Sequence, residues 1–209
     1  MHILIADDHA IVRKGIKQLL LEEYPSSEIE EVGDGESLVK KAITKEWDVV
    51  ICDLDMPGRS GLDAMRQIKE VYPKLPVLIM SIYPEEQYAV RVLKAGAAGY
   101  LSKDAATEEL VKAVRRVLQG RKYISSSMAE IIAEDFGHSN ADKAPHEFLS
   151  DREFEVFKLI ASGQTVSEIA EKRSLSGTTV STYRARILAK MNMKTNAELT
   201  RYALDNKLI

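Results

Sequence analysis

The first 120 residues alternate between short apolar runs and longer amphipathic segments, and this alternation limits the possible folds more than any other feature. Five runs have the length of buried strands, the second being the most polar: Ile3–Ala6, Glu28–Val32, Val49–Asp53, Val77–Ser81 and Gly99–Leu101. Segments with helical periodicity lie near and between them: Ile11–Glu23, Ser37–Lys45, Gly61–Val71, Glu85–Ala95 and Thr107–Gln119. Because parallel strands need helical crossovers, this order predicts an α/β domain with a doubly wound five-stranded parallel sheet.

The remaining residues have a different sequence pattern, with no further strand-like runs. Ser125–Phe136 has the pattern of a short helix, and residues 137–147 (GHSNADKAPHE) are small, polar and typical of a linker. Four helical segments follow: Ser150–Ser162, Thr165–Arg173, Gly177–Met191 and Asn196–Asn206. We therefore expect a sheet domain over residues 1–122, a linker with a short helix over 123–147, and a smaller all-α domain over 148–209.

Charge is unevenly distributed along the chain, whose net charge is −3. Residues 1–120 hold 16 Lys and Arg against 20 Asp and Glu, whereas residues 148–209 hold 10 against 7. Residues 172–197 contain six basic residues and no acidic one, which favours a polyanionic partner for that end, although solvated helix faces are often basic too.

Composition and segment length argue against a membrane protein. No stretch reaches the roughly 18 apolar residues that a membrane span needs, and the first residues do not resemble a signal peptide. The single cysteine, Cys52, excludes an intrachain disulfide and lies in an apolar run, which is typical of a small buried side chain. We expect a cytoplasmic protein.

Polar residues cluster where the predicted strands end. Asp7 and Asp8 follow the first strand, Asp53 ends the third, Ser81 ends the fourth and Lys103 follows the fifth. In a doubly wound sheet these ends meet at one crevice. Three carboxylates in one place require a hard cation, and oxygen ligands favour Mg²⁺. A cation and a lysine beside a carboxylate suit phosphoryl transfer to that carboxylate, with the serine hydroxyl donating to the phosphoryl group.

The C-terminal segments have the spacing of a helix-turn-helix. Thr165–Arg173 and Gly177–Met191 are separated by a three-residue turn, and hydroxyls and arginines without acids suit contacts to DNA phosphates and base edges. We expect the following residues of the second helix to face outward, at least in part: Thr178, Thr179, Ser181, Thr182, Arg184, Ala185, Arg186 and Lys190. The same spacing would also fit a small helical domain that docks on another protein.

Residues 1–120 resemble the receiver domain of bacterial two-component response regulators, a flavodoxin-like fold. The matching segments are IADDH (5–9), DLDMPGRSG (53–61), Ser81 and GYLSK (99–103). The resemblance implies that Asp53 is the phosphoacceptor and that Lys103 contacts the phosphoryl group. It also implies a Mg²⁺ held by Asp8, Asp53 and the backbone carbonyl of Asp55, with Asp7 alongside. Ser81 and Tyr100 look like the switch pair, in which the tyrosine ring turns inward upon phosphorylation.

The C-terminal segments LSDRE, ASG, EIA and TVSTYRARIL resemble the four-helix DNA-binding domain of the family that includes nitrate- and quorum-sensing regulators. This resemblance implies binding of double-stranded DNA as a homodimer when active, commonly with the fourth helix at the dimer contact. Ser181 and Tyr183 stand where many members have Lys and His, so base specificity does not carry over. Ser181, Thr182 and Ala185 are groove-facing candidates, and Arg184, Arg186 and Lys190 are candidates for phosphate contacts.

Together these features predict a transcription regulator. A sensor histidine kinase would phosphorylate Asp53, and the change in domain arrangement or dimerisation would control operator binding. The only chemistry expected is Mg²⁺-dependent self-phosphorylation from a donor and slow autodephosphorylation. Ile82 is bulky where many receivers have a small residue, and we predict that it hinders donors or water. The four histidines are scattered, and none is assigned a role.

Two other functions fit parts of the sequence. The Asp-x-Asp of DLDMP superficially resembles phosphatases of the haloacid-dehalogenase type, but Met56 departs from their pattern and a cap domain is missing. Alternatively, the receiver is never phosphorylated and serves only for dimerisation or ligand sensing; the complete set of acidic, hydroxyl and lysine residues argues against this.

Overall fold

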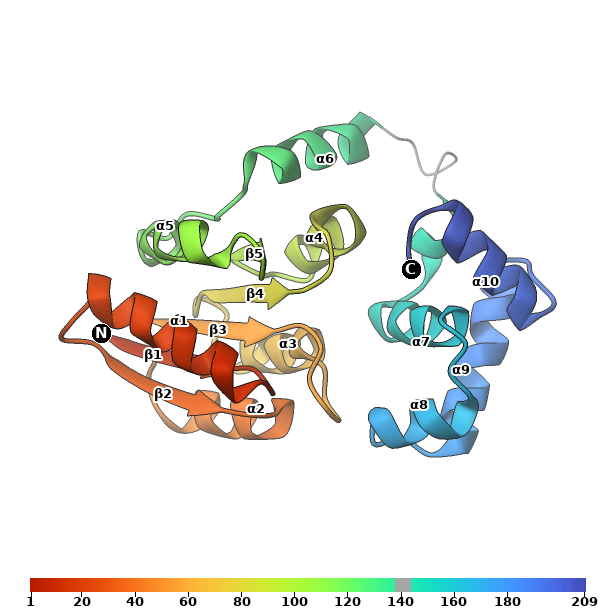
Figure 1. Cartoon of the computed structure of the whole chain (residues 1–209), viewed down its shortest axis with the longest axis horizontal. Coiled ribbons are helices and arrows are strands. Elements are labelled where there is room, and N and C mark those ends of the chain that lie inside the picture. The colour runs from red at the N-terminus through yellow and green to blue at the C-terminus, as the bar shows by residue number, and fades with distance from the viewer. Residues whose placement is uncertain (138–143) are drawn as a thin grey trace. The chain divides into compact units, whose positions relative to one another are not determined.

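The computed structural model describes residues 1–137 and 144–209, and its first part is the predicted parallel sheet (Figure 1). The strands are β1 (His2–Ala6), β2 (Glu28–Val32), β3 (Val49–Asp53), β4 (Val77–Ser81) and β5 (Gly99–Ser102), in the order β2-β1-β3-β4-β5. All neighbours pair in parallel, with Ala6 opposite Cys52, Asp53 opposite Met80 and Ser81 opposite Ser102. This register brings the carboxyl ends of the central strands to the same level.

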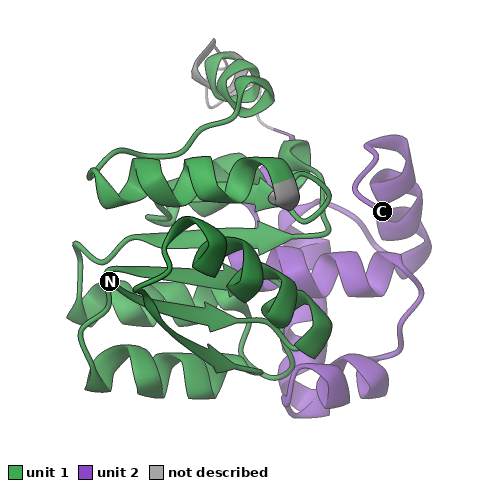
Figure 2. Ribbon diagram, turned by 60° about the vertical axis from the view of Figure 1, so that its left-hand side comes forward, with its two compact units in different colours: residues 1–135 green, residues 136–209 purple. Residues whose placement is uncertain are grey.

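Four helices connect the strands and a fifth follows β5, and together they lie on both sides of the sheet (Figures 1 and 2). They are α1 (Ala10–Glu23), α2 (Gly35–Thr44), α3 (Gly61–Val71), α4 (Glu85–Lys94) and α5 (Ala106–Leu118). α1 and α5 share a core with alternate residues of the strands. Leu20 of α1 and Val114 of α5 belong to this core together with Ile5 of β1 and Ile51 of β3. The four apolar runs of the sequence therefore correspond to buried strands and the helical periods to half-buried helices, whereas the more polar edge strand β2 is only partly buried.

The chain divides into two compact units, residues 1–135 (unit 1) and 136–209 (unit 2), which are distinguished by colour in Figure 2. α6 (Ser126–Gly137) is the predicted short helix, and most of it groups with unit 1. The division between the units thus falls within residues 123–147, where we placed the linker with its short helix. Residues 138–143 of the predicted linker lie outside the described residues, and Pro145–Phe148 form a short 3₁₀ helix, η1.

Unit 2 contains the four predicted helices: α7 (Asp151–Ala161), α8 (Val166–Lys172), α9 (Gly177–Lys190) and α10 (Asn196–Asp205). Capping residues define where they begin. The Ser150 amide donates to Glu153 Oε2 at 2.7 Å, while Ser150 Oγ accepts from the Glu153 amide at 3.4 Å, which is the reciprocal cap typical of a serine followed three residues later by a glutamate. Ser176 caps α9 by a single bond, in which its Oγ accepts from the Thr179 amide.

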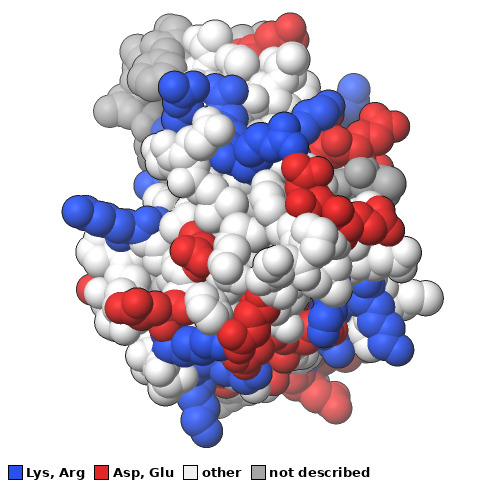
Figure 3. All heavy atoms as spheres, turned by 90° about the vertical axis from the view of Figure 1, so that its left-hand side faces the viewer, with Lys and Arg blue, Asp and Glu red and all other residues white. Residues whose placement is uncertain are grey.

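Several charged residues along β2 and around α2 pair with one another. Lys45 Nζ lies 2.5 Å from Glu28 and 3.0 Å from Glu30, and Lys41 Nζ lies 2.6 Å from Glu30. Acidic and basic side chains are interspersed on the face shown in Figure 3. Such exposed pairs stabilise the fold little but keep this face from carrying a field of one sign. Among the described helices, none is both long and apolar enough to cross a bilayer.

Candidate functional site

The carboxylates of Asp7, Asp8 and Asp53 meet at the carboxyl edge of the sheet, as the sequence predicts. Asp53 ends β3, and the two other aspartates follow β1, the strand beside it. The side chains of Asp7 and Asp53 are almost fully buried, with 2% and 4% exposed, whereas Asp8 is exposed to solvent. Two buried carboxylates side by side repel each other and require a cation.

Lys103 supplies one such cation from the turn after β5. Its Nζ lies 2.6 Å from Asp7 Oδ2 and 2.7 Å from Asp53 Oδ2, so that one ammonium bridges the two buried carboxylates. Burial of the ammonium lowers the pKa of Lys103, but the bonds to Asp53 and Asp7 outweigh it, and the pKa is raised. Lys103 is therefore held in its charged form next to the acidic residues.

The positive charge of Lys103 offsets the cost of burying the Asp53 carboxylate only in part. Burial raises its pKa to about 6, against the hydrogen bond and charge of Lys103, which lower it; the negative charge of Asp7 adds to the increase. The second oxygen, Oδ1, accepts a 3.3 Å hydrogen bond from the Asp55 amide. Any further positive charge would stabilise the ionised form of this carboxylate. This edge of the sheet is therefore a favourable position for a metal ion.

Side-chain atoms suited to a metal lie close together here. One ligand atom each from Asp7, Asp8, His9 and Asp53 falls within 4.8 Å of the others. Oxygen ligands that are partly open to water match the preference of Mg²⁺. His9 was assigned no role from the sequence, yet its Nδ1 lies 2.7 Å from Asp8 Oδ1. Its position directly after the two aspartates, at the end of the segment IADDH, was the sequence signal that could have indicated it.

Ser81 and Tyr100 lie on the opposite side of Asp53 from β1, on β4 and β5, and both are completely buried. Burial raises the pKa of the Tyr100 phenol, against a hydrogen bond with Ser81 that lowers it. The phenol donates to the Tyr83 carbonyl at 2.7 Å, so the ring already lies in the interior of the structure. The sequence had suggested that the ring takes this position upon phosphorylation.

Tyr83 is a member of the site that the sequence analysis missed. Its amide donates to Ser81 Oγ at 3.1 Å, and its phenol donates to Asp55 Oδ2 at 3.3 Å. Its ring stacks on Tyr88 of α4, with 5.1 Å between centroids. Tyr83 thus connects the hydroxyl side of the pocket with the loop after β3. No motif singled it out, because its role depends on contacts between segments distant in the sequence.

The backbone at Asp53 is closely packed, and a large apolar side chain follows Ser81. Gly61, at the start of α3, lies so close that a Cβ there would overlap the Asp53 carbonyl oxygen and approach Cys52 Sγ to 2.8 Å. Cys52 is fully buried, as expected from its apolar surroundings. Ile82, directly after Ser81, has 67% of its surface exposed. The exposure of this large apolar side chain next to the pocket is consistent with a role at its entrance.

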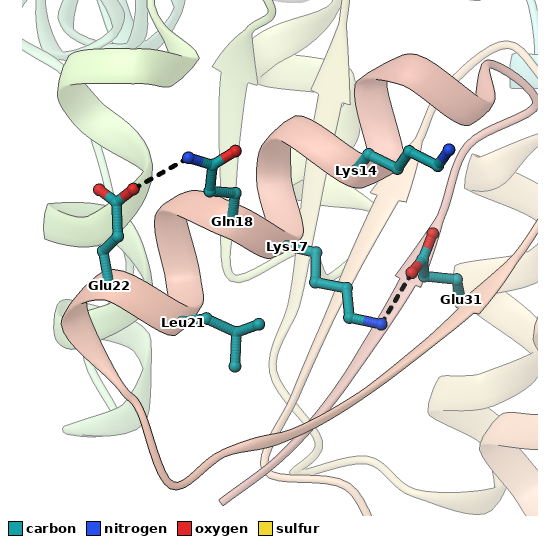
Figure 4. Close-up of a pocket in the computed structure, with 6 residues that line it drawn as sticks. All are labelled: Lys14, Lys17, Gln18, Leu21, Glu22 and Glu31. Atoms are coloured by element: carbon teal, nitrogen blue, oxygen red, sulfur yellow. Dashed lines mark hydrogen bonds and ion pairs between the residues drawn. The ribbon is translucent and has the colours of Figure 1, made fainter.

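A separate hollow of about 510 Å³ lies over the outer face of α1 (Figure 4). Its walls carry charges of both signs, and Lys17 Nζ pairs with Glu31 at 3.0 Å across it. The residues that line it are Lys14, Lys17, Gln18, Leu21, Glu22 and Glu31. None of them belongs to the predicted site, and the mixed charges do not favour an anion or a cation.

In unit 2, α8 and α9 pack together as a helix-turn-helix, with Ile169, Ala170, Val180 and Ile187 buried. Six of the eight predicted outward-facing residues of α9 are exposed, whereas Thr179 and Arg184 are half-buried. The exposed residues are Thr178, Ser181, Thr182, Ala185, Arg186 and Lys190. A helix face with hydroxyls, methyl groups and cations but no acid is suited to the major groove of DNA.

Two of the long cationic side chains on α9 have partners within unit 2. Arg184 Nε donates to Asn196 Oδ1 at 2.6 Å, and Lys190 Nζ lies 2.6 Å from Glu153 Oε2. Arg186 is exposed. In this structure, contacts of Arg184 and Lys190 with a phosphate would have to compete with these bonds, which the sequence did not reveal.

Comparison with known proteins agrees with both halves of this description. Residues 3–115 match the response regulator receiver domain, and residues 147–203 match the bacterial regulatory proteins of the luxR family. A receiver joined to such a helical unit defines a response regulator, in which phosphorylation controls transcription. The receiver match alone covers more than half of the chain, and the chain belongs to the luxR-type response regulators of two-component systems.

Relatives of similar length support this assignment. The chain is 39% identical to the oxygen regulatory protein NreC of Staphylococcus carnosus over 215 residues, covering 100% of this chain and 99% of the relative. It is 37% identical to the response regulator UvrY of Escherichia coli over 208 residues, covering 100% and 95%. The structure of RcsB from Salmonella enterica bound to the rprA promoter with the phosphomimetic BeF₃⁻ has a TM-score of 0.65 at 28% identity, covering 97% and 98%.

Membership of the receiver family also bears on the metal. Receivers generally use Mg²⁺ at their acidic pocket, and the cluster of Asp7, Asp8 and Asp53 is such a pocket. The family is one of regulators rather than of enzymes that turn over a substrate.

Proposed function

We propose that Asp53 accepts a phosphoryl group from a sensor histidine kinase. In this transfer the N–P bond of a phosphohistidine breaks, an O–P bond forms on the Asp53 carboxylate, and the released imidazole nitrogen takes up a proton. The observation that carries the proposal is the bridge of Lys103 between Asp7 and Asp53, because it places a cation beside a carboxylate that burial destabilises. The same carboxylate would react slowly with small phosphodonors and would slowly lose the group to water.

Mg²⁺ would be held by the carboxylates of Asp8 and Asp53 and the backbone carbonyl of Asp55, with Asp7 alongside; when bound, it offsets charge on the phosphoryl oxygens. Lys103 Nζ keeps its bond to Asp7 while it turns from the carboxylate toward a phosphoryl oxygen. The Ser81 hydroxyl donates to another phosphoryl oxygen, and Tyr100 remains inside with its phenol on the Tyr83 carbonyl.

For the output, we infer that α9 enters the major groove of double-stranded DNA. Arg186, together with Arg184 and Lys190 once they leave their partners, would contact phosphates. Ser181, Thr182 and Ala185 would approach base edges near the middle of the helix, and Thr178 and Thr179 near its start. Two dimers of the structural neighbour RcsB have been seen bound to two parallel DNAs. A homodimer of this chain would engage two half-sites, and Leu204 of α10, 58% exposed, supports a dimer contact on that helix.

One experiment tests together whether Asp53 is the phosphoacceptor, whether the chain dimerises and whether DNA binding responds. The full chain is compared with and without BeF₃⁻ and Mg²⁺ by gel filtration and by binding to a pool of random duplexes. We expect the phosphomimetic to promote dimers and tighten DNA binding, and Asp53→Asn to abolish both effects. Asp104→Asn, which removes an exposed carboxylate of unit 1, is the matched control and should respond like the native chain.

If Asp53→Asn responds like the native chain, Asp53 is not the acceptor. If neither form changes with BeF₃⁻ while both bind DNA, the receiver serves only for dimerisation or ligand sensing.

A further inference from the structure

After α5 the chain turns back to the edge of the sheet at β5. Tyr123 forms a bridge with Gly99 of β5, and its amide donates to the Ala98 carbonyl at 2.8 Å. Its phenol donates to Glu109 Oε2 of α5 at 2.7 Å. Five residues later Met128, in the first turn of α6, is completely buried. The beginning of α6 is therefore packed on unit 1 and is not a solvated linker.

A single carboxylate holds the first turn of α6. Ser125 Oγ donates to Glu85 Oε2 at 2.6 Å, and Ser127 Oγ donates to the same oxygen at 2.5 Å. Ser125 Oγ also accepts from the Met128 amide at 3.1 Å and thus caps the helix. Hydrogen bonds to an ionised carboxylate are stronger than those between neutral groups. We call these contacts of Glu85 with Ser125 and Ser127 the linker clasp.

Glu85 stands four residues after Ser81, and the segment between them is tied to the pocket. The Tyr83 amide donates to Ser81 Oγ, and the Tyr83 carbonyl accepts from Tyr100. Pro84, with φ fixed near −60°, leads directly into α4 at Glu85. Burial is the main cause of the raised pKa of both Tyr100 and Tyr123, and the charge of Glu85 adds to the increase, so this carboxylate lies within electrostatic range of both phenols. A change at Ser81 therefore has a short covalent and hydrogen-bonded path to the linker clasp.

From this geometry we infer that Glu85 is a positioning residue that couples occupancy of the phosphoacceptor pocket to docking of the linker helix α6. The inference rests on the proposed function of Asp53. A phosphoryl group draws the Ser81 hydroxyl toward it and favours the Tyr100 position seen here, which fixes the Tyr83 carbonyl and the start of α4. The linker clasp is formed in this same arrangement, so a phosphorylated receiver holds the start of α6 more firmly.

Thermodynamic reciprocity makes the inference quantitative. If the phosphomimetic tightens the linker clasp by some factor, the linker clasp tightens binding of the phosphomimetic by the same factor. We expect a coupling of roughly fivefold, at the lower end of what is common between sites in proteins. A purely structural role of Glu85 would stabilise α6 equally with and without a ligand in the pocket.

The test uses hydrogen exchange of the full chain with Mg²⁺ and BeF₃⁻ as the probe. Amides 126–133 of α6 should exchange roughly fivefold more slowly when the probe is bound. Glu85→Ala should abolish this difference and raise the half-saturating BeF₃⁻ concentration by the same factor. Glu86→Ala, which removes the exposed neighbouring carboxylate of α4, is the matched control. Ser127→Ala should reproduce part of the effect of Glu85→Ala on exchange and on BeF₃⁻ binding without altering α4. Ser126→Ala should leave both measurements unchanged.

Amides 53–60 around the acceptor report binding of the probe independently. If these become protected while amides 126–133 exchange at the same rate with and without the probe, the coupling is refuted and the proposed function stands. If Glu85→Ala binds the probe as tightly as Glu86→Ala, the coupling is equally refuted. If amides 53–60 do not respond in the native chain, the phosphoacceptor pocket itself is refuted and the coupling with it.

Discussion

Replacing Asp53 by asparagine is expected to stabilise the metal-free receiver while destroying its phosphoacceptor. Asparagine has nearly the same shape as a protonated aspartate but carries no charge into the interior. Lys103 would keep its 2.6 Å ion pair with Asp7, so the substitution does not leave the ammonium without a partner. The net effect therefore follows from the free energy needed to keep Asp53 ionised in the folded state.

Its magnitude follows from the pKa of Asp53, which burial raises from the ordinary value of 3.8 to about 6. Each pKa unit corresponds to about 1.4 kcal/mol, so the ionised side chain destabilises the folded state by about 3 kcal/mol at pH 7.5. Because the folded pKa lies above the unfolded one, the native chain is favoured at low pH and loses this stability as the pH rises through about 6. At pH 4.5 the expected gain from Asp53→Asn is only about 1 kcal/mol.

The single tryptophan makes the measurement specific for the receiver. Trp47 lies just before β3 and is 8% exposed, so its fluorescence reports unfolding of this unit during titration with urea. The native chain and Asp53→Asn are compared in EDTA at pH 4.5 and pH 7.5. Asp104→Asn serves as the control, because it removes an equal charge from an exposed position. Added Mg²⁺ should narrow the gap by binding the native carboxylates.

Two outcomes would refute this reasoning. The first is a variant that is no more stable than the native chain at pH 7.5 in EDTA, since burial of Asp53 would then carry no free-energy penalty. The second is a gain that is the same at both pH values, since it would then arise from something other than ionisation of the carboxyl.

Three further substitutions test other parts of the structure. Ile82→Ala is expected to speed phosphorylation by a small donor or dephosphorylation, and unchanged rates of both would contradict a role at the entrance. Gly61→Ala places a methyl group on the Asp53 carbonyl and should lower the unfolding free energy by about 3 kcal/mol or more, measured by urea titration. Gly15→Ala, where the new methyl group meets nothing within 4 Å, is its control, and equal stability of the two variants would contradict the close contact. Arg186→Ala should weaken binding to all DNA sequences alike and reduce the salt dependence of log K by about 1, whereas a loss confined to certain sequences would indicate a base contact.

The acidic pocket was predictable because strand ends are visible in the sequence. Apolar runs mark where β1, β3 and β4 end, and parallel pairing brings those ends to one edge whatever the details of packing. Asp7, Asp53 and Lys103 therefore came together as expected. The helix-turn-helix was predictable for a similar reason, since its period, caps and turn are all local.

Only the tertiary structure decided how these parts are connected. Tyr83 and Glu85 belong to no recognised motif, and their roles arise from contacts with side chains of other elements. The pairing of Lys190 with Glu153 likewise joins α9 to α7. By itself the sequence determined the doubly wound parallel sheet, the composition of the acidic pocket and the class of the DNA-binding unit, because these depend on periodicity and chain order. The inward position of Tyr100, the raised pKa of Asp53 and the linker clasp depend on burial and on distances between remote residues, which become defined only when the chain is packed.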